Sequence, residues 1–137
     1  NRKLEYDSEN LMYTLLEEIL KNDDYKMLDF VCHFPVNMLI KNPYLLNDDE
    51  CLYAMNPATH VDFLVYNRVS KRAILAIEED GYAFHQKETA QAKRDLLKNH
   101  IFELYYIPLL RFSTTGSGER EKIINMLNKI LNIGDLK

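Results

Sequence analysis

Hydrophobic side chains in the first third of the chain follow a helical period and then a strand-like one. Over residues 9–20 apolar side chains recur every three to four residues, which predicts an amphipathic helix capped by Asp7 or Ser8. The apolar positions of this helix are Leu11, Leu15, Leu16 and Ile19. Residues 27–33 form a short apolar stretch compatible with a strand, and residues 36–40 can form one helical turn.

The middle of the chain contains the strongest strand signals. Residues 44–59 are polar, show no clear period and are expected to form a loop. The segments 60–66 and 73–79 are rich in β-branched and aromatic residues, and the short polar stretch 67–72 between them predicts a hairpin turn.

Helical spacing returns in the last third of the chain. The pattern predicts a helix over 87–105, a strand over 107–112 and a last helix over 119–131, capped by Ser117. The apolar positions of the first of these helices are Ala90, Leu97, Ile101 and Leu104. The predicted order is α-β-β-β-α-β-α. Because a helix between the third and fourth strands fits a crossover connection, we expect an α/β fold with a mixed central sheet flanked by helices.

The amino-acid composition indicates the class of protein. The 137 residues are 47% hydrophobic and 28% charged, which is typical of one folded domain, and the start at Asn1 suggests a domain excised from a longer protein. The apolar runs are far shorter than the roughly 20 residues that span a bilayer, so we expect a cytoplasmic protein that does not enter a membrane. Cys32 and Cys51 lack the spacing of a zinc site and are interpreted as packing residues.

Charge restricts how nucleic acid could bind. The net charge of −4 argues against a broad basic surface, so any contact with nucleic acid must be local. Lys93, Arg94 and Lys98 form a basic cluster in the predicted helix 87–105. A solvated helix face is the alternative interpretation of this cluster.

Acidic side chains on the predicted hairpin suggest a cation site. If Tyr66 faces Ile74 across the turn, Asp62 lies opposite Glu78, and the alternation of side chains places Asp80 on the same face. Like charges with Cβ atoms roughly 5 Å apart destabilise a sheet unless a cation neutralises them. The alternative is one wet face on which the acids are merely exposed. Apolar neighbours on both faces argue for a covered hairpin whose acids line a cleft; Leu64, Ile74 and Ala76 share the acidic face, and Val61, Phe63, Val65, Leu75 and Ile77 the other.

Four segments carry a resemblance to a known superfamily. Residues 60–65 (HVDFLV) and 76–81 (AIEEDG), with Phe84-His85 following, resemble the active-site hairpin of the PD-(D/E)xK, or restriction-endonuclease-like, nucleases. Residues 91–98 and 107–112 resemble the helix and strand that follow that hairpin. The branch most similar to this chain comprises domains related to very-short-patch repair endonucleases, often fused to helicase-type ATPases. The resemblance covers roughly residues 60–120.

This resemblance implies a fold, a reaction and a set of site residues. It implies a phosphodiesterase of restriction-endonuclease-like fold in which Asp62 and Glu78 bind Mg²⁺ or Mn²⁺. Asp80 occupies the position where the superfamily usually has lysine, so the cationic role passes to Lys93, Arg94 or Lys98 of the following helix. Gln91 is expected to support the site. His85 is expected to act as a base or to contact DNA, and Lys98 to contact DNA.

One further acid is considered on the first helix. Superfamily members often contribute an acid from this helix, and Glu9 is the best-placed candidate. We interpret Glu9 instead as a first-turn glutamate that complements the helix dipole. The glycine-rich stretch 115–118 lacks the Lys-Ser/Thr ending of a P-loop, which argues against nucleotide binding.

Three functions follow as hypotheses. The first is a metal-dependent DNA endonuclease or nicking domain of a larger DNA-processing protein, with a helicase-type ATPase in cis. The second is a catalytically reduced nuclease-like fold that serves as a DNA-binding or protein-docking module. The third is a protein-interaction domain without a nucleic-acid role. Metal-dependent cleavage separates the first from the others, and DNA binding separates the second from the third.

Overall fold

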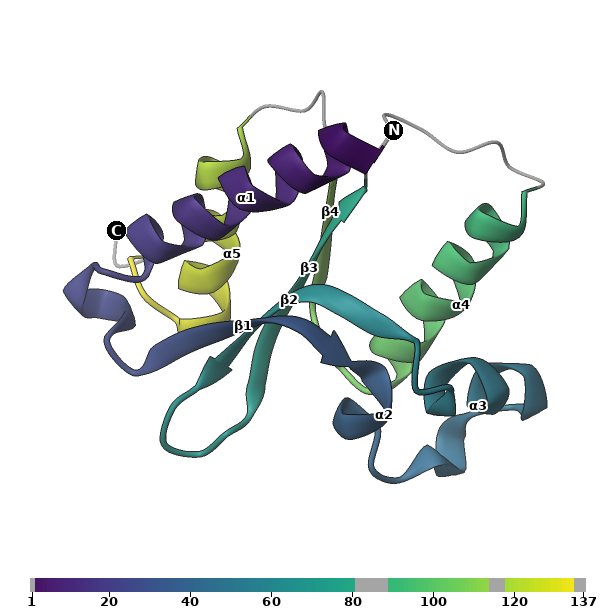
Figure 1. Ribbon diagram of the computed structural model, residues 1–137. Helices are drawn as coiled ribbons and strands as arrows, with labels where there is room; N and C mark the ends of the chain where they lie inside the picture. Colours follow the sequence, from purple (N-terminus) through teal and green to yellow (C-terminus); the bar gives the residue numbers. More distant parts are fainter. Residues whose placement is uncertain (1, 81–88, 114–117, 135–137) are drawn as a thin grey trace.

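A four-stranded sheet lies between two groups of helices (Figure 1). The computed structural model describes residues 2–80, 89–113 and 118–134, and the side chains of residues 2–7 and of Asp80 lie outside the description. The described α-helices are α1 (Arg2–Ile19), α2 (Val36–Leu39), α3 (Asp48–Met55), α4 (Ala90–Leu104) and α5 (Glu119–Leu131). Two short 3-10 helices are η1 (Asp23–Tyr25) and η2 (Pro43–Leu45). The described strands are β1 (Leu28–Pro35), β2 (His60–Asn67), β3 (Ala73–Asp80) and β4 (Leu109–Ser113).

The sheet is mixed, with the strand order β1-β2-β3-β4. Strand β2 is antiparallel to both β1 and β3, whereas β4 runs parallel to β3. A parallel neighbour requires a crossover connection, and α4 supplies it. The expectation of an α/β domain with a mixed sheet flanked by helices is therefore confirmed.

The hairpin register differs from the predicted one at the turn. Phe63 pairs with Ile77 and Val65 with Leu75, but Tyr66 pairs with Ala73 rather than Ile74, because the register shifts between Val65 and Tyr66. A bulge of this kind adds one unpaired residue on one strand. The bulge lies at the turn end, and the regular pairs continue from it as far as Phe63 and Ile77, the residues next to Asp62 and Glu78.

Two cores cover the two faces of the sheet. On one face α1 and α5 pack against the alternating side chains of β2 and β3; this core includes Met12, Leu16, Ile19, Phe63, Val65, Leu75, Ile77, Ile123 and Leu127. On the other face α2, α3 and α4 contribute to a second core, which includes Val36, Ile40, Ala54, Val61, Leu64, Ala76, Ile101 and Phe102. The hairpin is covered on both faces, as expected, but Val61 belongs to the second core and not to the first.

The first helix begins earlier than predicted and buries a different face. Its first described residue is Arg2, so neither Asp7 nor Ser8 is its cap. Leu11 is exposed and Met12 is buried in its place. The apolar residues at three-to-four residue spacing span more than one face of the helix, and packing on the sheet selected the face with Met12, Leu16 and Ile19.

A helix also replaces part of the expected loop 44–59. Helix α3 begins at a capping box in which the Asn47 side chain accepts from the Glu50 amide and the Glu50 carboxylate accepts from the Asn47 amide. The cap of α5 also differs, since its N-cap residue is Gly118, with φ of 80°, and Ser117 lies outside the described residues. Among the described helices, none is long and apolar enough to cross a membrane.

Candidate functional site

Asp62 is held in a fixed orientation near the middle of the sheet. Its side chain is 13% exposed, and its Oδ2 atom accepts a hydrogen bond from the Glu79 amide at 2.7 Å. The other oxygen, Oδ1, lies 3.8 Å from Nε2 of His60. The backbone of β3 therefore orients the carboxylate of β2, and one carboxylate oxygen faces a histidine.

Glu78 forms a buried ion pair with a lysine from α4. Nζ of Lys98 lies 2.8 Å from Oε2 of Glu78, and both side chains are at most 10% exposed. The same ammonium donates a hydrogen bond to the His60 carbonyl at 2.7 Å. Lys98 thus connects α4 to β2 and to β3 at the level of the two acids.

Burial dominates the electrostatics of the acidic pair. It raises the pKa of Asp62, and the Glu9 carboxylate raises it further, whereas the Glu79 amide, Lys98 and His60 lower it. Burial also raises the pKa of Glu78, and Asp62 adds to this increase, while Lys98 opposes it. Two carboxylates that resist ionisation next to each other form a site that a bound cation would stabilise in its charged form.

The raised pKa of Asp62 predicts a pH-dependent stability in metal-free buffer. Between the ordinary aspartate pKa of about 4 and the raised one, the folded state binds more protons than the unfolded state. The free energy of unfolding that Asp62 contributes should therefore be fully present below the unfolded pKa and be lost as the pH rises through the folded pKa. Asp62→Asn keeps an acceptor for the Glu79 amide but cannot titrate.

Urea unfolding in EDTA at mildly acidic and at neutral pH tests this sign. We expect the difference in unfolding free energy, variant minus wild type, to become more positive toward neutral pH. A difference that is constant, or that changes in the opposite direction, would contradict the raised pKa. Comparing the two proteins cancels the contribution of Glu50, whose pKa is lowered chiefly by a backbone hydrogen bond from Asn47.

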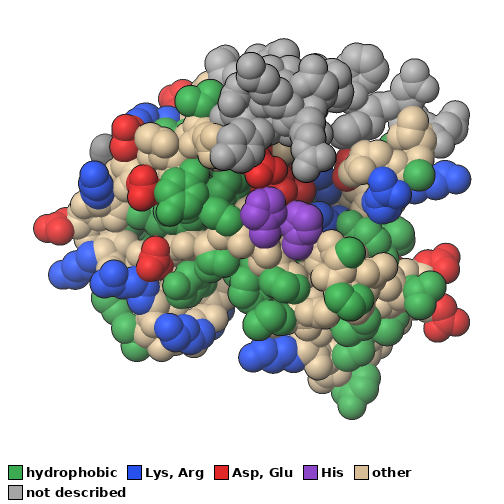
Figure 2. Space-filling view, in the orientation of Figure 1, with side chains coloured by type: hydrophobic (Ala, Val, Ile, Leu, Met, Phe, Trp, Pro, Cys, Tyr) green, Lys and Arg blue, Asp and Glu red, His purple; other side chains and the backbone are tan. Residues whose placement is uncertain are grey.

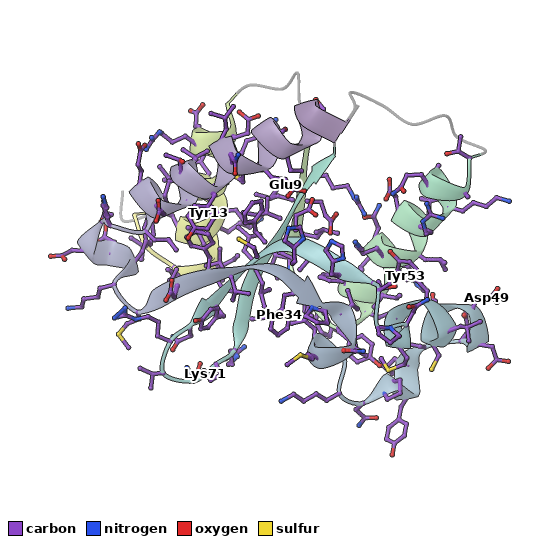
Figure 3. All side chains as sticks on the ribbon, viewed as in Figure 1. Glu9, Tyr13, Phe34, Asp49, Tyr53 and Lys71 are labelled. Atoms are coloured by element: carbon purple, nitrogen blue, oxygen red, sulfur yellow. The ribbon has the colours of Figure 1, made fainter. Side chains whose placement is uncertain are left out.

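Helix α1 contributes two polar side chains toward the sheet. The Ser8 hydroxyl donates to Oε2 of the buried Glu79 at 2.9 Å, so this serine binds β3 and does not cap a helix. Oε1 of Glu9 lies 3.4 Å from Nε2 of His33, and Figure 3 shows Glu9 on the side of α1 that faces the sheet. Our interpretation of Glu9 as a first-turn residue is wrong, because the described helix α1 already includes Arg2, seven positions before it.

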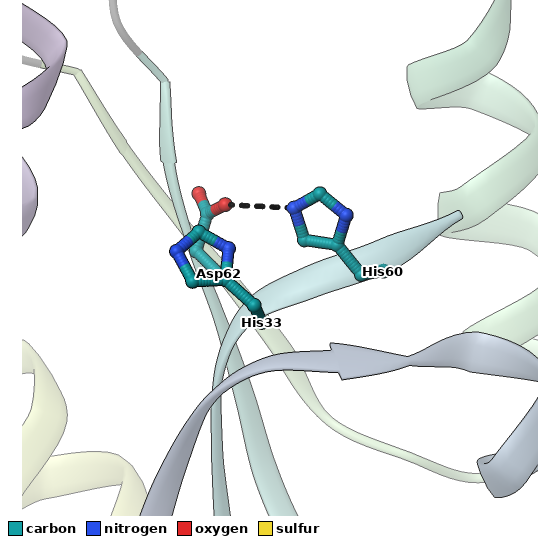
Figure 4. Close-up of side chains that lie close together, drawn as sticks. All are labelled: His33, His60 and Asp62. Atoms are coloured by element: carbon teal, nitrogen blue, oxygen red, sulfur yellow. Dashed lines mark ion pairs between the residues drawn. The ribbon is translucent and has the colours of Figure 1, made fainter. Parts of the chain in front are cut away.

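Two histidines that were not predicted as site residues complete this region. His33 on β1 and His60 on β2 lie with Asp62 in a group whose ligand atoms are all within 4.8 Å of one another (Figure 4). The rings of the two histidines make an edge contact, with centroids 5.0 Å apart. Figure 2 shows histidine side chains in the middle of this face, next to acidic ones. The spacing His60-Val61-Asp62 was a usable signal, since residues two apart in a strand share a face.

The remaining predicted helix residues are placed elsewhere. Nε2 of Gln91 donates to Asp95 at 2.9 Å, and Arg94 donates to Gln91 at 2.9 Å, so these side chains contact their own helix. Lys93 is exposed and lines a hollow between α3 and α4. Of the three helix cations, Lys98 is the one whose described contacts reach the acids. The side chain of Asp80 and the whole of His85 lie outside the described residues.

The comparison with known proteins places the chain in a family. A family model described as "Protein of unknown function (DUF2726)" matches residues 1–130. The chain belongs to the DUF2726 family. No curated protein and no solved structure matches the chain.

Two further side chains of this DUF2726 member are electrostatically coupled to Glu78. Arg111 on β4, whose strand position pairs with Glu78, lowers the pKa of Glu78 and binds Asp95 at 3.4 Å and Asn99 at 3.0 Å. Tyr53 on α3 has a pKa raised first by burial, and Lys98 and Glu78 are among the charges that act on it. Both residues were missed, because their approach to Glu78 depends on how β4 and α3 pack.

Proposed function

We propose that this domain is a divalent-metal-dependent DNA endonuclease or nicking domain of restriction-endonuclease-like fold. It would act as a module of a larger DNA-processing protein that carries a helicase-type ATPase in cis. The observation that carries the proposal is the convergence of Asp62 on β2, Glu78 on β3 and Lys98 on α4, with Nζ of Lys98 2.8 Å from Glu78. Two acids and one lysine on adjacent elements match the composition of the site that the sequence resemblance implies.

Two cations outside β3 can provide the positive charge that the superfamily usually places at the position of Asp80. Lys98 brings a positive charge to Glu78 from α4, so the third strand need not provide it. Arg111 adds a second positive charge on the same side of the sheet, because it too contacts α4. These cations are suited to hold a phosphate oxygen or to orient a water molecule near the acids.

The donor set fits a hard divalent cation. Mg²⁺ and Mn²⁺ prefer carboxylate oxygens on rigid elements, and Asp62 and Glu78 provide them from adjacent strands. When bound, such a cation polarises a phosphodiester and lowers the pKa of a coordinated water. Within the chain, the Glu79 amide keeps Asp62 oriented, Lys98 opposes the increase that burial causes in the pKa of Glu78, and both acidic side chains are largely buried.

Cleavage of supercoiled plasmid DNA with Mg²⁺ or Mn²⁺ tests the proposal. We expect nicking by the wild type in either metal and a loss of at least about a hundredfold in Asp62→Asn and in Glu78→Gln, since each removes a charged ligand. Glu103→Gln is the matched control, because Glu103 is an exposed acid on α4. It should cleave at the wild-type rate.

The other outcomes separate the alternatives. Metal-dependent nicking that survives both Asp62→Asn and Glu78→Gln would refute the site. DNA binding without nicking would favour the catalytically reduced module, and neither activity would favour a protein-docking role. In an independent thermal-unfolding measurement, Mn²⁺ should raise the melting temperature of the wild type and not that of Asp62→Asn.

A further inference from the structure

A second set of metal-ligating groups shares Asp62 with the acidic pair and differs from that pair in chemistry. His33, His60 and Asp62 offer two imidazole nitrogens and one carboxylate oxygen, all within 4.8 Å of one another. We propose that these three residues bind a borderline divalent metal ion of the Zn²⁺ or Co²⁺ type. The proposal concerns binding by the histidines and holds whether or not the domain cleaves DNA.

The hydrogen bonds around His60 leave one ring nitrogen available. Nδ1 of His60 lies 3.2 Å from the Ala58 carbonyl, and a carbonyl can only accept, so Nδ1 carries the hydrogen. In the neutral ring Nε2 then holds a lone pair, and it faces Oδ1 of Asp62 at 3.8 Å. Two acceptors that face each other in this way can be bridged by a cation. The titration below distinguishes a metal ion from a protonated histidine.

The other two proposed ligands, His33 and Asp62, also contact polar groups that are not part of the set. Glu9 lies 3.4 Å from Nε2 of His33, and the Glu79 amide binds Oδ2 of Asp62, which leaves Oδ1 on the side of His60. Histidines that bind metals usually donate their second ring N–H to a carbonyl or carboxylate, and ligating carboxylates are in turn hydrogen-bonded. Each of the three side chains here has a partner of that kind.

Exposure and backbone geometry fit an open site that takes a metal ion from solution. The side chains of His33 and His60 are 56% and 41% exposed, whereas that of Asp62 is 13% exposed. His33 has a φ of 53° within strand β1, a conformation that is costly for a residue other than glycine and that re-aims its side chain. Imidazole ligands favour Zn²⁺, Co²⁺ and similar ions over Mg²⁺.

Titration of the EDTA-treated chain with Co²⁺, followed by its visible absorption and by competition with Zn²⁺, tests the proposal. We expect one Co²⁺ per chain with nitrogen and oxygen ligands, and an affinity at least about tenfold lower in His33→Gln and in His60→Gln. His100→Gln is the matched control, because His100 is a similarly exposed histidine that pairs with a glutamate, Glu50, elsewhere on the surface. It should bind Co²⁺ like the wild type.

Three results would overturn the site. They are no Co²⁺ binding by the wild type, unchanged affinity in both histidine variants, or a thiolate charge-transfer band that assigns Cys32 as a ligand. Glu78→Gln separates this proposal from the nuclease proposal, because it should abolish nicking and leave Co²⁺ binding intact. Far-UV circular dichroism checks folding. If His60→Gln unfolds, the test uses His33→Gln, because His33 is the more exposed of the two histidines.

Discussion

Replacing Lys98 by methionine is expected to lower the free energy of unfolding by about 3 kcal/mol at neutral pH, because it leaves the buried Glu78 carboxylate without its partner. The substitution also removes the hydrogen bond to the His60 carbonyl. Methionine has a similar length and an unbranched stem, so little of the loss should come from packing. Urea unfolding with a constant m-value is the measurement.

The pH dependence of this deficit identifies its cause. Without Lys98 the pKa of Glu78 should rise further above its ordinary value, so the deficit should shrink as the pH falls and Glu78 becomes protonated in the folded state. The double variant Lys98→Met/Glu78→Gln should recover much of the stability at neutral pH. Lys93→Met on the exposed face of α4 should stay within about 0.5 kcal/mol of the wild type.

Two observations would refute this role of Lys98. One is a Lys98→Met protein as stable as Lys93→Met at neutral pH. The other is a deficit that does not change on acidification, which would assign the loss to packing rather than to an unpaired charge. If the nuclease proposal holds, Lys98→Met should also lose metal-dependent nicking under conditions in which it remains folded.

Phe102→Ala is expected to destabilise the chain by about 4 kcal/mol, the usual cost of removing a fully buried phenylalanine. Phe102 has no exposed surface, and it packs with Leu64 and Ala76 of the sheet and with α2 and α3 residues in the second core. Truncation would leave a cavity that these elements can only partly fill. Thermal and urea unfolding would measure the loss.

Leu96→Ala provides the control for this core prediction. Leu96 lies on the same helix but is 66% exposed, so its truncation should cost less than about 0.5 kcal/mol. Phe102 is four residues after Lys98 and holds the same helix against the sheet. A Phe102→Ala protein as stable as Leu96→Ala would contradict the packing of α4 on this face.

The local signals of this chain predicted much of the fold. The hairpin and the bounds of the last helix, 119–131, were found where the pattern placed them, because β-branched alternation, turn residues and helical spacing act within a few residues. The capping box at Asn47 was an equally local signal for α3 and was overlooked among the acidic residues around it. The bulge at Tyr66 was not predictable, since it depends on pairing across strands.

For the candidate site, the sequence by itself determined the acidic pair. Side-chain alternation along the two strand segments predicted that these acids come close together, and in the structure Asp62 is among the charges that raise the pKa of Glu78. The tertiary structure decided which partners reach them. Lys93, Arg94 and Lys98 are equivalent in the sequence, and the packing of α4 on the sheet brings Lys98 to Glu78. The same holds for His33 and Glu9. His33 approaches Asp62 through the pairing of β1 with β2, and Glu9 does so because α1 packs across the sheet, an arrangement set by burial of apolar surface rather than by any local pattern.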